Sequence, residues 1–280
     1  MKQLKMLALL FAAILLTFSA CKKDDDEDPG TVVEISNIEL SSDNTTLTIT
    51  FNQGVYKNAD QTGNIDAGSF ALTFVAANPV AASFTAQHTA GENKAIITIT
   101  YENRTDGDEM LDVTVKANTV YGEAGNAVTE DLMESLDVND LGIIGKWSAY
   151  DISAILASLG YDDSLYANFY ADQSYMVTAF VGGASATFVG VYEMEKTQFD
   201  NIWEIALNQT ELNGQPTEIL SEGIFKVYPA AQDSMWYEVA QVDPAIAGVI
   251  PPTADQGFGS TSGGAFGTMN IQKYHWIGQE

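Results

Sequence analysis

The sequence predicts an all-β protein with two domains, a β-sandwich followed by an antiparallel barrel. Three observations lead to this prediction. Apolar and polar residues alternate with period two over many short segments, which is typical of half-buried strands. Clusters of Ser, Asn, Asp and Gly separate these segments, as turns do. The chain has 280 residues, enough for two domains at about 150 residues each. We therefore divide it into a leader (residues 1–20), a tether (21–31), and domains over 32–138 and 139–280.

The leader has the three parts of a signal peptide. Lys2 and Lys5 make its start positive, an apolar run covers residues 6–16, and small residues precede Cys21. The apolar run is too short to span a bilayer, which needs about 20 residues. The end of the leader resembles the lipobox of bacterial lipoproteins, with Phe18 in place of the usual leucine. This resemblance implies that Cys21 carries diacylglycerol and acyl chains of the palmitate type and anchors the protein to a membrane. The alternative is an ordinary secretory signal followed by a chance cysteine.

The segment after Cys21 is strongly acidic, with five Asp or Glu residues at positions 24–28. A segment of this composition cannot bury enough apolar surface to become ordered, so we expect a solvated tether. Its position directly after the cysteine resembles the export signal of Bacteroidota-type surface lipoproteins. The resemblance implies an outer-membrane lipoprotein that faces the cell exterior, and the periplasmic face is the alternative.

The first domain is expected to consist of short strands. Leu47, Ile49 and Phe51 alternate with threonines, and the same period recurs over residues 97–101 and 111–115. Polar turn clusters lie at residues 41–44, 60–63 and 106–108. Alternating strands with frequent turns predict a sandwich of two sheets. Residues 33–130, and above all the pattern AxxVYxxxGNA at 117–127, resemble the bacterial Ig-like domains of surface adhesins. In that family such domains act mostly as spacers or adhesive modules.

The second domain begins after a polar break at residues 139–142. Its first strand contains Gly145 and Trp147, and a short amphipathic helix is expected around residues 152–159. Further strands are predicted at residues 175–180, 187–194, 201–207, 223–228, 235–242 and 268–276. A meander of this length tends to close into a barrel. The Gly-x-Trp at its start resembles lipocalin-like (calycin) barrels. A long loop rich in Pro, Gly, Ser and Thr at 244–264 interrupts the pattern, so a flattened or partly open barrel is the alternative.

Composition excludes several classes of function. The formal net charge is −26, and it becomes two units more negative when the leader with Lys2 and Lys5 is removed. Such a surface repels phosphate backbones, so we expect no nucleic-acid partner, whereas basic partners, divalent cations and neutral ligands remain open. Cys21 is the only cysteine, so the chain can form neither an internal disulfide nor a thiolate metal site.

The sequence contains no catalytic motif. His88 and His275 lie in different predicted domains, and no Gly-x-Ser-x-Gly motif is present. We therefore expect no catalytic residues, no metal and no cofactor. The least favoured alternative is a hydrolase in which two carboxylates face each other across a cleft.

Two groups of acidic side chains resemble calcium loops only loosely. Asp60, Asn64 and Asp66 form one group, and Asp106 and Asp108 form the other. Neither follows the EF-hand spacing with its closing glutamate, so we expect them to form turns.

The tryptophans give the strongest indication of a ligand site. All four lie in the second domain, together with nine of the twelve tyrosines, and aromatic side chains suit sugar rings and apolar ligands. We expect Trp203 and Trp236, in the middle of two predicted strands, to contribute to a pocket, and Trp147 to seal one end of the barrel. The alternative is that these aromatics form the core. The sequence thus predicts a cell-surface lipoprotein that binds a glycan or an apolar small molecule without catalysis, or alternatively a purely structural or adhesive protein.

Overall fold

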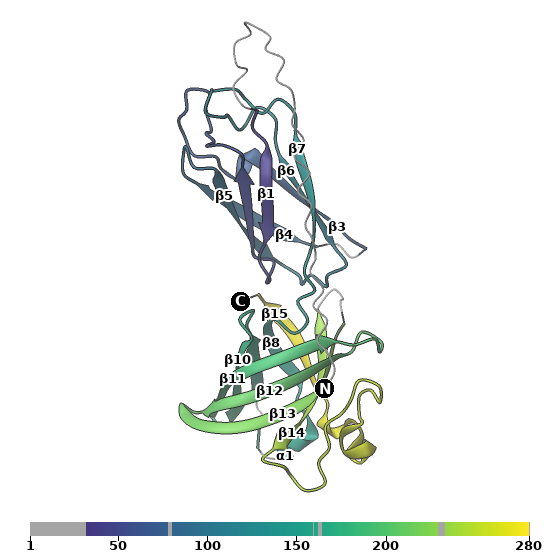
Figure 1. Cartoon of the computed structure of the whole chain (residues 1–280). Helices are drawn as coiled ribbons and strands as arrows, with labels where there is room; N and C mark the ends of the chain where they lie inside the picture. The colour runs from purple at the N-terminus through teal and green to yellow at the C-terminus, as the bar shows by residue number, and fades with distance from the viewer. Residues whose placement is uncertain (1–31, 78–79, 159, 162–163, 229–232, 280) are drawn as a thin grey trace, which may run out of the picture.

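The computed structural model of the chain describes residues 32–279, apart from 78–79, 159, 162–163 and 229–232 (Figure 1). The leader, Cys21 and the acidic run therefore lie outside the described residues. The described chain is all-β, as predicted, with separate sheets in its first part and a closed barrel in its second. Figure 1 shows the two parts stacked end to end. Among the described residues, no helix combines the length and the apolar character needed to cross a bilayer.

Two antiparallel sheets that share one hydrophobic core make up the first domain. The four-stranded sheet has the order β1 (Ile35–Leu40), β2 (Thr46–Phe51), β5 (Lys94–Tyr101) and β4 (Ala82–His88). The three-stranded sheet has the order β3 (Phe70–Val75), β6 (Met110–Val115) and β7 (Leu132–Asp137). A short 3-10 turn, η1 (Ala67–Ser69), precedes β3.

Period-two alternation decides which side chains enter this core. On β2, Leu47, Ile49 and Phe51 are buried while the threonines between them are half-buried. The inner residues of β5 and β6 follow the same rule. The predicted strands at 46–51, 97–101 and 111–115 are thereby confirmed.

The first domain meets the barrel through the turn between β1 and β2. The side chain of Gln279, next to the C-terminal residue, donates a hydrogen bond of 2.9 Å to the carbonyl of Asp43 in this turn. Because β1 ends just before the turn, it runs toward the barrel. Val32, three residues before β1, therefore lies toward the opposite end of the domain.

The second domain is a closed eight-stranded antiparallel meander. Its strands are β8 (Gly145–Asp151), β9 (Ser164–Phe169), β10 (Ser174–Val181), β11 (Ala184–Lys196), β12 (Trp203–Leu212), β13 (Gln215–Tyr228), β14 (Ser234–Asp243) and β15 (Gln272–Gly278). The first strand, β8, pairs with both β9 and β15. This closure rules out the partly open alternative.

The sequence missed one strand of the barrel and misplaced the starts of others, since β13 begins at Gln215 and not at residue 223. No strand was predicted at β9, whose inward residues alternate with an outward tyrosine, Tyr166. The last strand was expected from Thr268, but residues Gly267–Asn270 form a 3-10 turn, η3, and β15 begins at Gln272. The predicted amphipathic helix is present as the short α1 (Ala154–Ser158).

The long loop after β14 is packed against the outside of the barrel. Ala254 and Phe258 cover the outward side chains of Ile202 and Ile224, and the loop contains the 3-10 turn η2 (Thr261–Gly264). The loop therefore does not interrupt the barrel wall, because the chain leaves the sheet after β14 and returns to it at β15.

Candidate functional site

The end of the barrel that faces the first domain is filled with aromatic side chains. Trp147 is fully buried, and its indole nitrogen donates a hydrogen bond of 2.8 Å to the carbonyl of Ile143. The Phe169 ring packs edge-on against Tyr192 at 5.3 Å. Burial raises the pKa of Tyr175 to about 12 and also raises the pKa of Tyr237, so these phenols stay neutral at physiological pH. Trp147 thus occupies the sealing position predicted for it.

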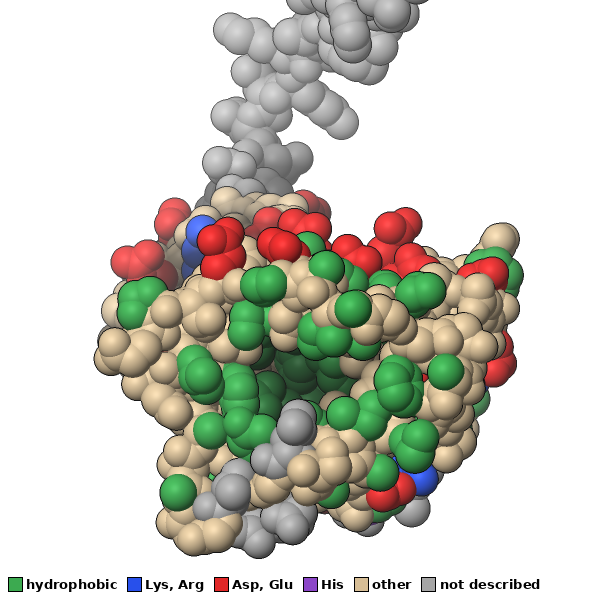
Figure 2. Space-filling view, turned by 90° about the horizontal axis from the view of Figure 1, so that it is seen from below, with side chains coloured by type: hydrophobic (Ala, Val, Ile, Leu, Met, Phe, Trp, Pro, Cys, Tyr) green, Lys and Arg blue, Asp and Glu red, His purple; other side chains and the backbone are tan. Residues whose placement is uncertain are grey.

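The opposite end of the barrel is hollowed. Figure 2 looks into this end and shows hydrophobic side chains around and inside the hollow, with Asp and Glu side chains gathered along one side. Segment α1 lies at this end. Half-buried hydrophobic side chains from α1, the segments beside it and β11 pack here against the barrel core, namely Ile152, Leu156, Tyr161 and Phe188. The Tyr161 and Phe188 rings meet edge-on at 6.0 Å. The barrel is therefore filled at one end and open, with an apolar lining, at the other.

The structure does not bring Trp203 and Trp236 into one pocket. Trp203 faces the barrel interior at the end near the first domain, where its ring stacks on Phe225 at 5.7 Å. Trp236 points outward, because Met235 and Tyr237 on either side of it belong to the barrel core. Its ring contacts Phe258 of the long loop at 5.7 Å. The two side chains line different hollows of the surface, and a role for either in ligand binding stays a prediction.

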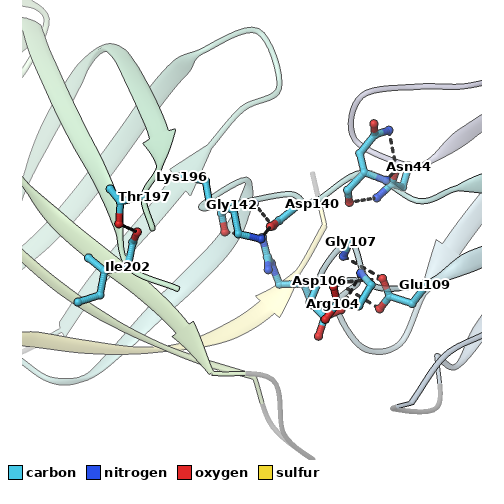
Figure 3. Close-up of polar contacts among 12 residues, drawn as sticks. Asn44, Arg104, Asp106, Gly107, Glu109, Asp140, Gly142, Lys196, Thr197 and Ile202 are labelled. Atoms are coloured by element: carbon cyan, nitrogen blue, oxygen red, sulfur yellow. Dashed lines mark hydrogen bonds and ion pairs between the residues drawn. The ribbon is translucent and has the colours of Figure 1, made fainter. Parts of the chain in front are cut away.

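A second hollow, of about 400 Å³, lies at the joint between the domains. We call it the joint pocket. Its lining comes from the first domain, the linker and the barrel: Arg104, Asp106, Asp108, Asp140, Gly142, Lys196, Asn201, Trp203 and Val227. Figure 3 shows how Arg104 reaches across to Gly142 while Lys196 of the barrel meets Asp140 of the linker. The distance between the Lys196 ammonium and the Asp140 carboxylate is 2.6 Å.

Arg104 is the only arginine in the chain, and it connects the first domain to the linker and the barrel. Its side chain is 6% exposed. Its guanidinium donates to the Gly142 carbonyl at 2.5 Å and lies 5.7 Å from the centre of the Trp147 ring. Burial lowers its pKa to about 10, a shift that nearby carboxylates such as Asp140 and Asp233 oppose. Arg104 is therefore charged at neutral pH, and its Nε is buried with no hydrogen-bond partner among the described residues.

The loop that carries Arg104 is shaped by hydrogen bonds between the Glu109 side chain and backbone amides of the same loop. The Glu109 carboxylate accepts the amide hydrogens of Asp106 and Gly107, and burial raises its pKa. Gly107 has a φ of +85°, and a Cβ there would lie 2.6 Å from the side chain of Asp140. Only glycine allows the loop to approach the linker this closely.

A third hollow, of about 360 Å³, lies on the outer face of the barrel. Four glutamates from β11, β12 and β13 line it beneath Pro251 and Pro252, namely Glu193, Glu195, Glu204 and Glu222. Within the part of the chain that the structure describes, no group of three or more acidic, His or Cys side chains is arranged to hold a metal ion. This hollow is an acidic groove.

The two histidines have structural surroundings in separate domains. His88 Nδ1 accepts the Ile65 amide at 3.3 Å, and its Nε2 lies 3.0 Å from the Glu92 carbonyl. His275 stacks on Tyr150 at 4.1 Å, on the strand pair formed by β8 and β15.

The acidic groups that resemble calcium loops make hydrogen bonds within turns. Asp60 accepts from the Thr62 hydroxyl at 2.5 Å, and Asp66 caps the 3-10 turn η1 by accepting from Gly68. Asp106 accepts from the amide of Asp108 at 3.2 Å. Asn64 accepts from the amide of Ala90 at 2.9 Å. These contacts agree with the turn-forming interpretation.

Comparison with known proteins finds no family model, no curated relative and no solved structure that matches the chain. The joint pocket was not predicted from the sequence, although a single arginine in a chain with 12 basic residues was a usable indication. Arginine serves buried charge contacts and aromatic stacking better than lysine does.

Proposed function

We propose that this protein is an outer-membrane lipoprotein of the cell surface that binds an uncharged apolar ligand in its barrel without catalysis. One observation carries the proposal: the closed barrel is filled at one end and has an open apolar hollow at the other (Figure 2). Small eight-stranded barrels hold one small ligand when side chains do not fill the interior. An uncharged ligand fits best, since the chain carries a net charge of −26 and would repel anionic amphiphiles.

The strand order supports an assignment of both domains to known architectures. The sheets β1-β2-β5-β4 and β3-β6-β7 have the order of the ABED and CFG sheets of constant-type Ig domains. The second domain combines an eight-stranded meander with a buried tryptophan in its first strand, which is consistent with a lipocalin-like barrel. We propose an Ig-like spacer followed by a lipocalin-like binding domain.

The direction of the chain supports the spacer role. If Cys21 carries the lipid, the 11 residues of the tether reach at most about 40 Å and then enter the first domain at the end away from the barrel. The first domain then lies next to the membrane, and the open mouth of the barrel points away from it. This orientation suits capture of a ligand from outside the cell.

A fluorescent probe tests the binding proposal. Full-length protein is titrated with Nile red, an uncharged apolar dye, which is then displaced with dodecanol. Phe188→Ala shortens a side chain at the mouth, and we expect it to weaken dye binding by about 1–3 kcal/mol, the range for one buried aromatic ring. Val191→Ala is the matched control, because Val191 lies on the same strand but is 49% exposed on the outer surface. If neither compound binds, the structural or adhesive alternative replaces this proposal.

A further inference from the structure

We propose that the joint pocket is a second binding site, specific for neutral sugars, and that it is separate from the apolar mouth of the barrel. The pocket of about 400 Å³ falls within the range of small-molecule sites, and such sites occur preferentially at domain interfaces. Both domains and the linker contribute side chains to it (Figure 3). A ligand in this position would contact both domains at once.

The donors and acceptors of the pocket fit a polyhydroxylated ligand. Asp106 and Asp108 supply carboxylate acceptors, whereas Asn201 supplies an amide and Lys196 an ammonium group. Each sugar hydroxyl can both donate and accept, so it can use both kinds of group. Trp203 adds an aromatic side chain to the lining, and aromatic side chains combine apolar surface with specific contact geometry.

Arg104 lines the pocket, and one nitrogen of its guanidinium is buried without a partner among the described residues. Its Nη2 is bonded to Gly142, but its Nε–H is buried and unpartnered among the described residues. An unsatisfied buried donor is unfavourable, so native structures rarely leave one unpaired.

The charges of the pocket disfavour the competing classes of ligand. Three aspartates line it, Asp106, Asp108 and Asp140, and they would repel a phosphate or carboxylate ligand. Arg104 and Lys196 would repel a metal cation, and the carboxylates of the described chain are not grouped to hold one. The five charges nearly cancel, which leaves a neutral ligand that forms hydrogen bonds.

Isothermal titration calorimetry of the full-length protein tests this site. The probes are the methyl glycosides of glucose, galactose, mannose and N-acetylglucosamine. A ligand with one sugar ring should bind with a dissociation constant of roughly 0.1–10 mM, as expected for about a dozen heavy atoms. We expect Asp108→Ala and Lys196→Ala each to weaken binding of the best glycoside at least about tenfold, since each loses a charge-assisted hydrogen bond. Asp108 is exposed and Lys196 is half-exposed, so neither change removes core packing.

Matched controls separate the pocket from the rest of the surface and from the barrel mouth. Glu211→Ala and Lys94→Ala remove exposed charges elsewhere and should leave glycoside binding unchanged. Asp108→Ala should also leave the binding of Nile red unchanged. Failure of the sugar proposal can therefore be told apart from failure of the proposed apolar ligand in the barrel. The sugar proposal is overturned if no glycoside binds at about 100 mM, far above the expected dissociation constants. It is equally overturned if Asp108→Ala and Lys196→Ala bind the sugars as the wild type does.

Discussion

At the scale of single residues, Arg104 shows how one side chain joins two folding units. It belongs to the first domain, yet its guanidinium lies over Trp147 of the barrel and bonds to Gly142 of the linker. Its own backbone amide donates to the Asp233 carboxylate of the barrel at 2.9 Å. The filled end of the barrel is therefore completed by a residue from outside the barrel.

Replacement of Arg104 should destabilise the barrel measurably. Arg104→Ala removes a cation–π contact and a charged hydrogen bond, so we expect the free energy of unfolding to fall by about 2–4 kcal/mol. All four tryptophans belong to the barrel, so urea denaturation followed by tryptophan emission reports on this domain. Lys94→Ala, which removes an exposed positive charge from the first domain, is the control. Equal midpoints for the two variants would show that the joint does not stabilise the barrel.

The roles of individual side chains were harder to predict from the sequence than the buried faces of the strands were. The sequence placed Trp147, Trp203 and Trp236 on strands, but Trp236 stands between two core residues, Met235 and Tyr237. Both faces of β14 are apolar there because the long loop covers the outer face, so period two could not decide which face points inward. The contact between Arg104 and Trp147 joins separate domains, and no local pattern in the sequence encodes it.

At the scale of elements, the long loop after β14 is held by one buried carboxylate. Glu238 is fully buried on the outer face of β14 and accepts the amide hydrogens of Gly259 and Thr261, at 2.6 Å and 3.1 Å. The Thr261 hydroxyl also donates to Glu238 and accepts from the Asn270 amide at 3.1 Å. This network explains how a loop of high Pro, Gly and Ser content lies ordered against a barrel wall.

Glu238→Gln tests this function of the loop network. The amide keeps the shape of the carboxylate but replaces one acceptor oxygen with a donor, which leaves a buried donor of the loop unpaired. We expect a loss of about 1–3 kcal/mol in the free energy of unfolding and faster amide hydrogen exchange across residues 244–271. Glu218→Gln, a change at an exposed glutamate of β13, is the control. Unchanged exchange in the Glu238 variant would show that apolar contacts with Phe258 and Ala254 suffice.

Local periodicity predicted most strands and a barrel, but it left open whether the barrel closes fully. The inner faces of β2, β5 and β6 follow from the sequence because one face of each is apolar and the other is polar. Closure of the barrel depends on the pairing of β8 with β15, which are separated by more than a hundred residues. Strand β9 was missed because small Ala167 points inward and large Tyr166 points outward, which weakens the alternation.

At the scale of the whole molecule, the start of the first domain and the open mouth of the barrel lie at opposite ends of the protein. The tether joins the first domain at the end away from the barrel, and the β10–β11 hairpin closes at the barrel end away from the first domain. With a lipid at Cys21, this hairpin lies on the side of the barrel away from the membrane. Loop residues 122–126 lie near the start of the first domain, where Gly122 is close to Val33.

Antibody labelling of intact cells tests this orientation together with the proposed surface display. A short epitope is inserted at Gly183 in the β10–β11 hairpin, where an added Cβ would have no neighbour within 4 Å. We expect labelling of intact cells, because the hairpin projects from the surface.

Replacing residues 24–28 by alanine should abolish labelling of intact cells but not of permeabilised cells, since the protein would keep its lipid and remain inside the outer membrane. Cys21→Ser should release the protein from the membrane fraction and end its labelling with a palmitate analogue. Equal labelling of intact cells by the wild type and the alanine variant would show that the acidic run is only a spacer, and palmitate labelling that persists in Cys21→Ser would exclude the lipid anchor.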